Sequence, residues 1–160
     1  MKIGILNRPD IEELSTRPFK EKTALISITD YDDEYAELEF KPEYLFQIKF
    51  DDVDNDIFLD LQGKALPEEK HKDIAIKYHI ITDEQAKEIA DFIMNIKDKA
   101  EFIICQCEHG QSRSAAVAAA ITEYLYGDGI KIFSSDDYFP NKVVYRKVYE
   151  YLKQGGTYEF

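Results

Sequence analysis

The chain has little positive charge: 20 lysines and arginines stand against 32 aspartates and glutamates, for a formal net charge of -12. Long-range electrostatics therefore oppose binding to DNA, RNA or an anionic membrane. The deficit does not prevent a local pocket of main-chain amides and one arginine from binding a dianion, because buried charge-assisted hydrogen bonds outweigh screened surface repulsion. We expect no nucleic-acid partner and no membrane partner.

Cysteine and long apolar runs are also scarce. The cysteines Cys105 and Cys107 are too few and too close to form a disulfide framework, which favours a reducing compartment. No apolar run approaches the roughly 18 residues of a membrane-spanning helix, and the segment from Met1 shows no signal-peptide pattern. We therefore expect a cytoplasmic protein.

The length of 160 residues predicts one domain, residues 1–160, with a single core.

Short apolar segments alternate with amphipathic ones along the chain. Segments typical of buried strands are residues 2–6, 23–29, 44–50 and 101–106. Helices are predicted from the capping residue Thr82 onward, over 114–126, and from about residue 140 to the glycines at 155 and 156. Residues 57–79 are rich in charge and predict a surface excursion, with at most a strand near Ile74–Ile76. This alternation predicts a three-layer α/β/α fold with a central, mostly parallel sheet, whose ligand binds beyond the carboxyl end of a strand.

The most informative segment is residues 105–122, in which the end of an apolar strand, a short polar loop and an alanine-rich helix follow one another. Cys107 opens the loop and Arg113 closes it. The amides of a turn leading into a helix N-terminus can bind phosphoryl oxygens. The same amides, with a guanidinium beside them, stabilise a thiolate, the form in which cysteine is a nucleophile. The sequence predicts a phosphate-binding loop built around a nucleophilic cysteine.

Residues 107–114, Cys-Glu-His-Gly-Gln-Ser-Arg-Ser, resemble the signature of the cysteine-dependent protein tyrosine phosphatases. In that signature five residues separate a cysteine from an arginine, and a serine or threonine follows. Gly110 and the Ser-Arg-Ser ending look most like the compact dual-specificity branch and its bacterial or phage relatives. The resemblance implies a protein tyrosine phosphatase-like fold and a phosphomonoester hydrolase that needs no metal or other cofactor. Its substrate would be a phosphorylated protein or a small phosphomonoester; the oligomeric state stays open.

The roles of the loop residues follow from the same resemblance. Cys107 would attack phosphorus and form a phosphocysteine that water later cleaves. Arg113 would bind two phosphoryl oxygens with its planar fork, and Ser114 would donate a hydrogen bond to the sulfur. The implied phosphate-binding residues are Glu108, His109, Gly110, Gln111, Ser112 and Arg113.

A general acid is expected on a separate loop, where it would protonate the leaving oxygen and then activate water. Phe50-Asp51-Asp52 resembles the turn that ends a strand in this family, with the acid in last place, so Asp52 is the predicted acid. Asp51 and Asp54 remain as alternatives. We also expect Asn141 to brace a loop beside the site.

Two departures from the family pattern bear on activity. Gln106 precedes the cysteine where a histidine is usual, and His109 stands where a small residue is common. Gln106 favours a second hypothesis, a catalytically weak or inactive phosphate-binding interaction module. A rhodanese-like sulfur transferase also begins an anion-binding loop with a cysteine, but the Ser-Arg-Ser ending and the candidate acid argue against it.

The acidic run that starts at Asp52 superficially resembles a calcium-binding loop. Ile57 stands where such a loop needs its glycine, and Gly63 stands where it needs its bidentate glutamate. We therefore expect no metal site there. Cys105 is expected to be a small buried residue of the strand without a redox role.

Overall fold

The centre of the computed structural model, which describes residues 1–157, is a parallel sheet. Its strands are β1 (Lys2–Leu6), β2 (Thr23–Thr29), β3 (Tyr44–Lys49) and β4 (Phe102–Gln106). They are ordered β1-β4-β2-β3, and each neighbouring pair is parallel. The predicted α/β fold with a central parallel sheet is confirmed, and the strands begin within a residue of their expected positions.

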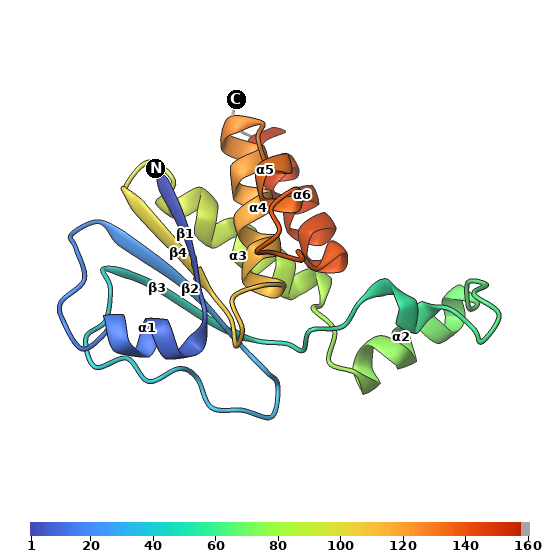
Figure 1. Cartoon of the computed structure of the whole chain (residues 1–160). Coiled ribbons are helices and arrows are strands. Elements are labelled where there is room, and N and C mark those ends of the chain that lie inside the picture. The colour runs from blue at the N-terminus through green and yellow to red at the C-terminus, as the bar shows by residue number, and fades with distance from the viewer. Residues whose placement is uncertain (158–160) are drawn as a thin grey trace.

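Helices cover both faces of the sheet (Figure 1). One face carries α3 (Asp83–Ile96), α4 (Arg113–Tyr126) and α6 (Lys142–Thr157), with the short α5 (Ile130–Phe133) beside α4. The other face carries α1 (Arg8–Leu14) and the loops that flank it. The sheet is therefore the middle of three layers, and its carboxyl edge lies between the two helical layers.

The main core lies between the sheet and the three-helix face. Ile26 of β2 and Ile103 of β4 meet Ile89 of α3 and Val117 of α4 there, and none of these four side chains is exposed. The alanines of α4 are fully buried, so this helix can lie close to β4. A smaller cluster around Ile11 and Leu25 packs beneath α1. Both clusters hold β4 in a fixed position, and β4 leads directly into the polar loop.

The helix predicted from Thr82 begins with a complete capping box. The Gln85 amide donates to Thr82 Oγ1 at 3.0 Å, and the Thr82 amide donates to Gln85 Oε1, also at 3.0 Å. These bonds satisfy backbone donors that a helix N-terminus otherwise leaves unpaired. The apolar side of α3 is buried as its periodicity predicted.

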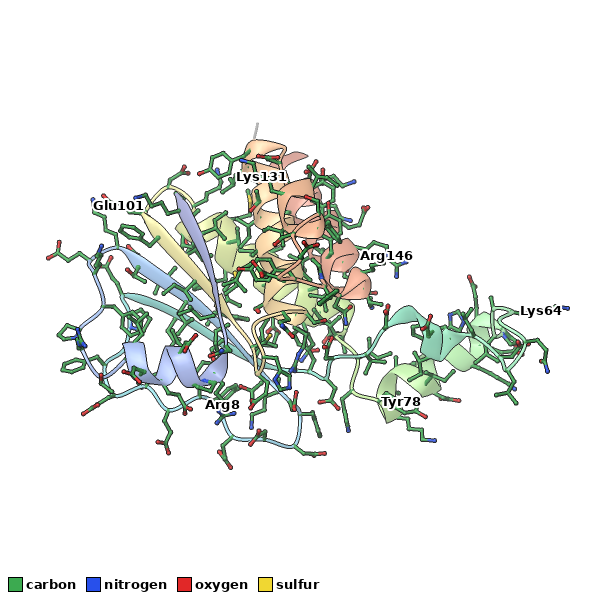
Figure 2. The ribbon with its side chains drawn as sticks, in the orientation of Figure 1. Arg8, Lys64, Tyr78, Glu101, Lys131 and Arg146 are labelled. Carbon is green, nitrogen blue, oxygen red and sulfur yellow. The ribbon has the colours of Figure 1, made fainter. Side chains whose placement is uncertain are left out.

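The charged segment after β3 extends away from the sheet (Figure 1). It contains a 3-10 helix, η1 (Asn55–Phe58), and α2 (Glu68–Lys77), and Lys64 lies near its far end in Figure 2. The expected strand at Ile74–Ile76 was wrong, because these residues belong to α2. An apolar run of three residues does not distinguish strand from helix. The acidic pair Glu68 and Glu69 at the N-terminus and Lys77 in the last turn favour the helix through its dipole.

No helix within residues 1–157 combines the length and the apolar character required to cross a lipid bilayer.

Candidate active site

The polar loop lies at the carboxyl end of β4, which has β1 on one side and β2 on the other. Cys107 follows the strand directly, and α4 begins at Arg113. Ligand sites of parallel α/β sheets form at this edge, beyond the strand ends. Cys107 Sγ lies 3.0 Å from Ser114 Oγ, within hydrogen-bonding distance, and both side chains are buried. The structure therefore brings together the predicted nucleophile and the serine expected to stabilise its sulfur.

The Arg113 side chain is buried at the base of the loop, with 3% exposure. One terminal nitrogen, Nη1, donates to the Phe50 carbonyl at 2.7 Å and lies 2.7 Å from Asp30 Oδ1. The buried Nε has no hydrogen-bond partner among the described residues. A buried N–H without an acceptor is costly, so its presence at a loop of this kind points to an anion as its partner.

The loop rests on the junction between β1 and α1. The Arg8 amide donates to the Glu108 carbonyl at 3.1 Å, and the two side chains form an ion pair at 3.6 Å. Gly110 has φ +66°, and a Cβ there would lie 2.8 Å from the Asn7 nitrogen and 2.9 Å from the Leu6 carbonyl carbon. Both the left-handed backbone and the contact with main-chain atoms require glycine. Local backbone geometry thus explains why the loop has a glycine at this place.

Gln106, the first departure from the family pattern, is a buried support for the loop. Its Oε1 accepts a hydrogen bond from Ser27 Oγ at 2.5 Å, and its Nε2 donates to the Cys107 carbonyl at 3.1 Å. The side chain therefore fixes the first residue of the loop to β2 without adding a charge. The second departure, His109, is exposed.

Asp52 lies against the loop. Its Oδ1 accepts hydrogen bonds from Ser112 Oγ at 2.8 Å and from Asn141 Nδ2 at 2.8 Å. The alternative Asp51 is engaged elsewhere: its Oδ1 accepts from the Tyr31 amide at 2.9 Å. The other alternative, Asp54, lies two residues further along the chain and is exposed, as Asp52 also is. Asp52 is thus hydrogen-bonded to the loop that carries the cysteine.

Asn141 joins the segments around Asp52. Its Nδ2 also donates to the Val53 carbonyl at 3.0 Å, and its Oδ1 accepts from the Val144 amide at 3.1 Å, in the first turn of α6. Its own amide donates to the Ser112 carbonyl at 3.2 Å. One buried residue thus links the loop through its main-chain amide, and the turn that carries Asp52 and the start of α6 through its side chain.

The long separation in sequence between Asp52 and Cys107 is explained by the excursion. The chain leaves the body of the fold after Asp52, forms η1 and α2, and returns at Ile80, which is buried. The Asp51 amide donates to the His79 carbonyl at 2.9 Å and closes this detour, and the rings of His79 and Tyr31 stack at 3.7 Å. The intervening residues therefore do not move the acid-bearing turn away from the loop.

Sequence reasoning missed Asp30, which follows β2 and pairs with Arg113. The parallel register places Ser27 of β2 beside Gln106 of β4, so a residue three positions past Ser27 lies at the same edge as the loop. A polar residue directly after a strand that neighbours β4 was the available signal. It required the strand order, which the sequence does not provide.

The other cysteine, Cys105, is fully buried on β4. Burial and, secondarily, the neighbouring Cys107 raise the pKa of the Cys105 thiol. Cys105 therefore stays protonated and packs as a small apolar side chain, whereas Cys107 faces Ser114.

No family model and no curated protein matches this sequence. Solved structures do match. Human DUSP28 is 13% identical with a TM-score of 0.51, covering 97% of this chain and 94% of that chain. A point variant of human DUSP28 is 13% identical with a TM-score of 0.52, covering 97% and 90%. Tk-PTP in its active form is 14% identical with a TM-score of 0.48, covering 96% and 92%. The DUSP28 matches show the fold alone, and it is the protein tyrosine phosphatase-like fold predicted from the sequence.

Proposed function

We propose that this protein hydrolyses phosphomonoesters through a phosphocysteine intermediate, with the chemistry of a protein tyrosine or dual-specificity phosphatase. The observation that carries the proposal is one loop that Cys107 opens and Arg113 closes, in which Cys107 Sγ lies beside Ser114 Oγ and the buried Arg113 Nε has no hydrogen-bond partner among the described residues. A cysteine thiolate, a guanidinium and the main-chain amides of such a loop would together suit a phosphoryl group.

The reaction has two steps, and each uses Asp52. In the first, Cys107 Sγ attacks phosphorus, the ester P–O bond breaks, and the leaving oxygen takes the electron pair and a proton from Asp52. In the second, Asp52 takes a proton from water, whose oxygen attacks phosphorus while the S–P bond breaks. Inorganic phosphate leaves, and Ser114 stabilises the thiolate that forms again. Arg113 neutralises the charge of the equatorial oxygens in both transition states.

The proposed substrate is a phosphorylated protein or a small phosphomonoester. We further propose that residues 1–160 form one cytoplasmic phosphatase domain. Nucleic acids are disfavoured as substrates by the net charge of -12. Gln106 does not argue strongly for an inactive module, because its amide hydrogen-bonds the Cys107 carbonyl and so supports the loop.

The test is phosphate release from a panel of aryl, peptide and small-metabolite phosphomonoesters, measured with chelator present. Cys107→Ser should abolish turnover, whereas the matched control Cys105→Ser should keep most of it. Arg113→Lys should lose about 3 kcal/mol of transition-state stabilisation, roughly a hundredfold in rate, because an ammonium cannot replace the planar fork. Asp52→Asn should slow esters with basic leaving groups most.

Full activity in Cys107→Ser would reject the assigned nucleophile. If the wild-type chain binds vanadate but releases no phosphate from any ester, the protein is a phosphate-binding module instead.

A further inference from the structure

A cavity lies on the α1 face of the sheet, at the amino ends of β1 and β4. Because α1 begins just past the carboxyl end of β1 and spans only 7 residues, it leaves the amino-terminal half of this face uncovered. The cavity has a volume of about 430 Å³, within the range of small-molecule sites. In Figure 2, Glu101 marks this end of the strands and Arg8 the opposite end, where the candidate active site lies. The two sites are therefore separate.

The floor of the cavity is apolar. Gly4 of β1 pairs with Ile104 of β4, and no atom lies within 4 Å of a Cβ added to Gly4. Phe19 and Phe102, both half-buried, and Leu14 complete the apolar walls. Because Gly4 has no side chain, the edge strand β1 leaves room there for an apolar group of a ligand.

The rim of the cavity is basic, in a chain whose net charge is -12. Lys2 Nζ and Lys20 Nζ lie 5.9 Å and 5.3 Å from the centre of the Phe102 ring, and Arg17 lines the same cavity. Across residues 1–157, none of these three cations forms an ion pair with a carboxylate. The neighbouring Glu101 is itself paired with Lys22 at 3.6 Å. The cations at the rim thus remain available to an anion from outside.

We propose that this cavity binds a monocarboxylate with a medium-length aliphatic chain. The chain would lie over Gly4 and Ile104, where it removes apolar surface from water. The carboxylate would meet Lys2, Arg17 and Lys20 at the rim through charge-assisted hydrogen bonds. A free carboxylate fits better than a lipid bilayer, because the site is concave and the negative charge of the whole chain repels an anionic membrane. The inference is independent of the proposed phosphatase activity.

The experiment is calorimetric titration of the full chain with decanoate. We expect saturable binding that weakens with added salt, and no binding of decyltrimethylammonium, which has the same chain and the opposite charge. Gly4→Leu places a side chain in the cavity, where its Cβ meets no atom within 4 Å, and should weaken decanoate binding at least about tenfold. The double variant Arg17→Gln/Lys20→Gln keeps the cavity open and should lose about tenfold through the lost charges alone. Lys64→Gln, on the distant excursion, is the matched control and should bind as the wild type does.

Equal decanoate affinity in the wild type, Gly4→Leu and the double variant would overturn the proposal, as would an absence of binding. Equal binding of the cationic amphiphile would show that the cavity is merely apolar and overturn the assignment of an anion. Sedimentation of the free chain tests another occupant: a dimer that Gly4→Leu dissociates would mean that a second copy covers this face, contrary to the proposal. Should Gly4→Leu fail to fold, the double variant and the salt dependence decide the matter.

Discussion

Replacement of Asn141 by alanine tests how the fold positions the proposed acid. Asn141 is buried, with 5% exposure, and its side chain makes three hydrogen bonds: Nδ2 to Asp52 Oδ1, Nδ2 to the Val53 carbonyl, and the Val144 amide to Oδ1. Alanine removes all three. It leaves the Val53 carbonyl and the Val144 amide without these partners, whereas Asp52 keeps its bond from Ser112.

The magnitude follows from these contacts. Loss of the cap on the first turn of α6 costs about 1 kcal/mol. The two other bonds contribute roughly 0.5–1.5 kcal/mol each, with the bond to the carboxylate at the upper end. We therefore expect the free energy of unfolding to fall by about 2–4 kcal/mol. The rate with a basic leaving group should fall roughly ten- to a hundredfold, because a displaced acid protonates the leaving oxygen poorly.

Asn141→Asp separates the two effects. Aspartate caps a helix as well as asparagine does, so the cap on α6 stays, but the donor to Asp52 and to the Val53 carbonyl is lost and a like charge faces Asp52. This variant should be more stable than Asn141→Ala, yet at least as slow with the basic leaving group. A variant that only disturbed the fold would show the opposite order.

The assay pairs denaturant unfolding with kcat/KM for two aryl phosphates, phenyl phosphate with a basic leaving group and p-nitrophenyl phosphate with an acidic one. The expected signature is a larger loss for phenyl phosphate in both variants. Equal losses for the two esters would refute the reasoning, because a positioning residue for the acid must matter more when protonation matters more.

Two further predictions concern the loop. Gly110→Ala should abolish vanadate binding and phosphate release, because its Cβ would lie 2.8 Å from a main-chain nitrogen of the β1–α1 junction. The control Gly63→Ala is also left-handed, at φ +78°, but lies in open space, so it should lose stability and keep activity. A fully active Gly110→Ala would contradict the close contact. Iodoacetamide at mildly alkaline pH should label Cys107 and leave Cys105 unlabelled. Burial raises the pKa of the Cys105 thiol, so this thiol stays protonated as the pH rises through the ordinary range of thiols. A peptide map with the adduct on Cys105 would show that β4 opens to solvent.

Much of the fold could be predicted because its signals are local. Hydrophobic runs marked all the strands of the described sheet, and a capping pair marked the start of α3. The spacing of Cys107 and Arg113 predicted a loop between a strand and a helix, and this also depends on neighbours in sequence. The strand expected near Ile74 failed for the same reason: three apolar residues carry too little periodicity to decide between strand and helix.

The sequence by itself therefore determined the strand–loop–helix unit that carries the cysteine, because its backbone geometry is set by residues close together in the chain. Only the tertiary structure decided which carboxylate meets that unit, how Gln106 supports it, and that Asp30 pairs with Arg113. The contacts with partners distant in sequence join residues 60 to 83 positions apart: Asp52 with Ser112, Ser27 with Gln106, and Asp30 with Arg113. They depend on strand order and helix packing, and those follow from burial of the whole core rather than from any local pattern.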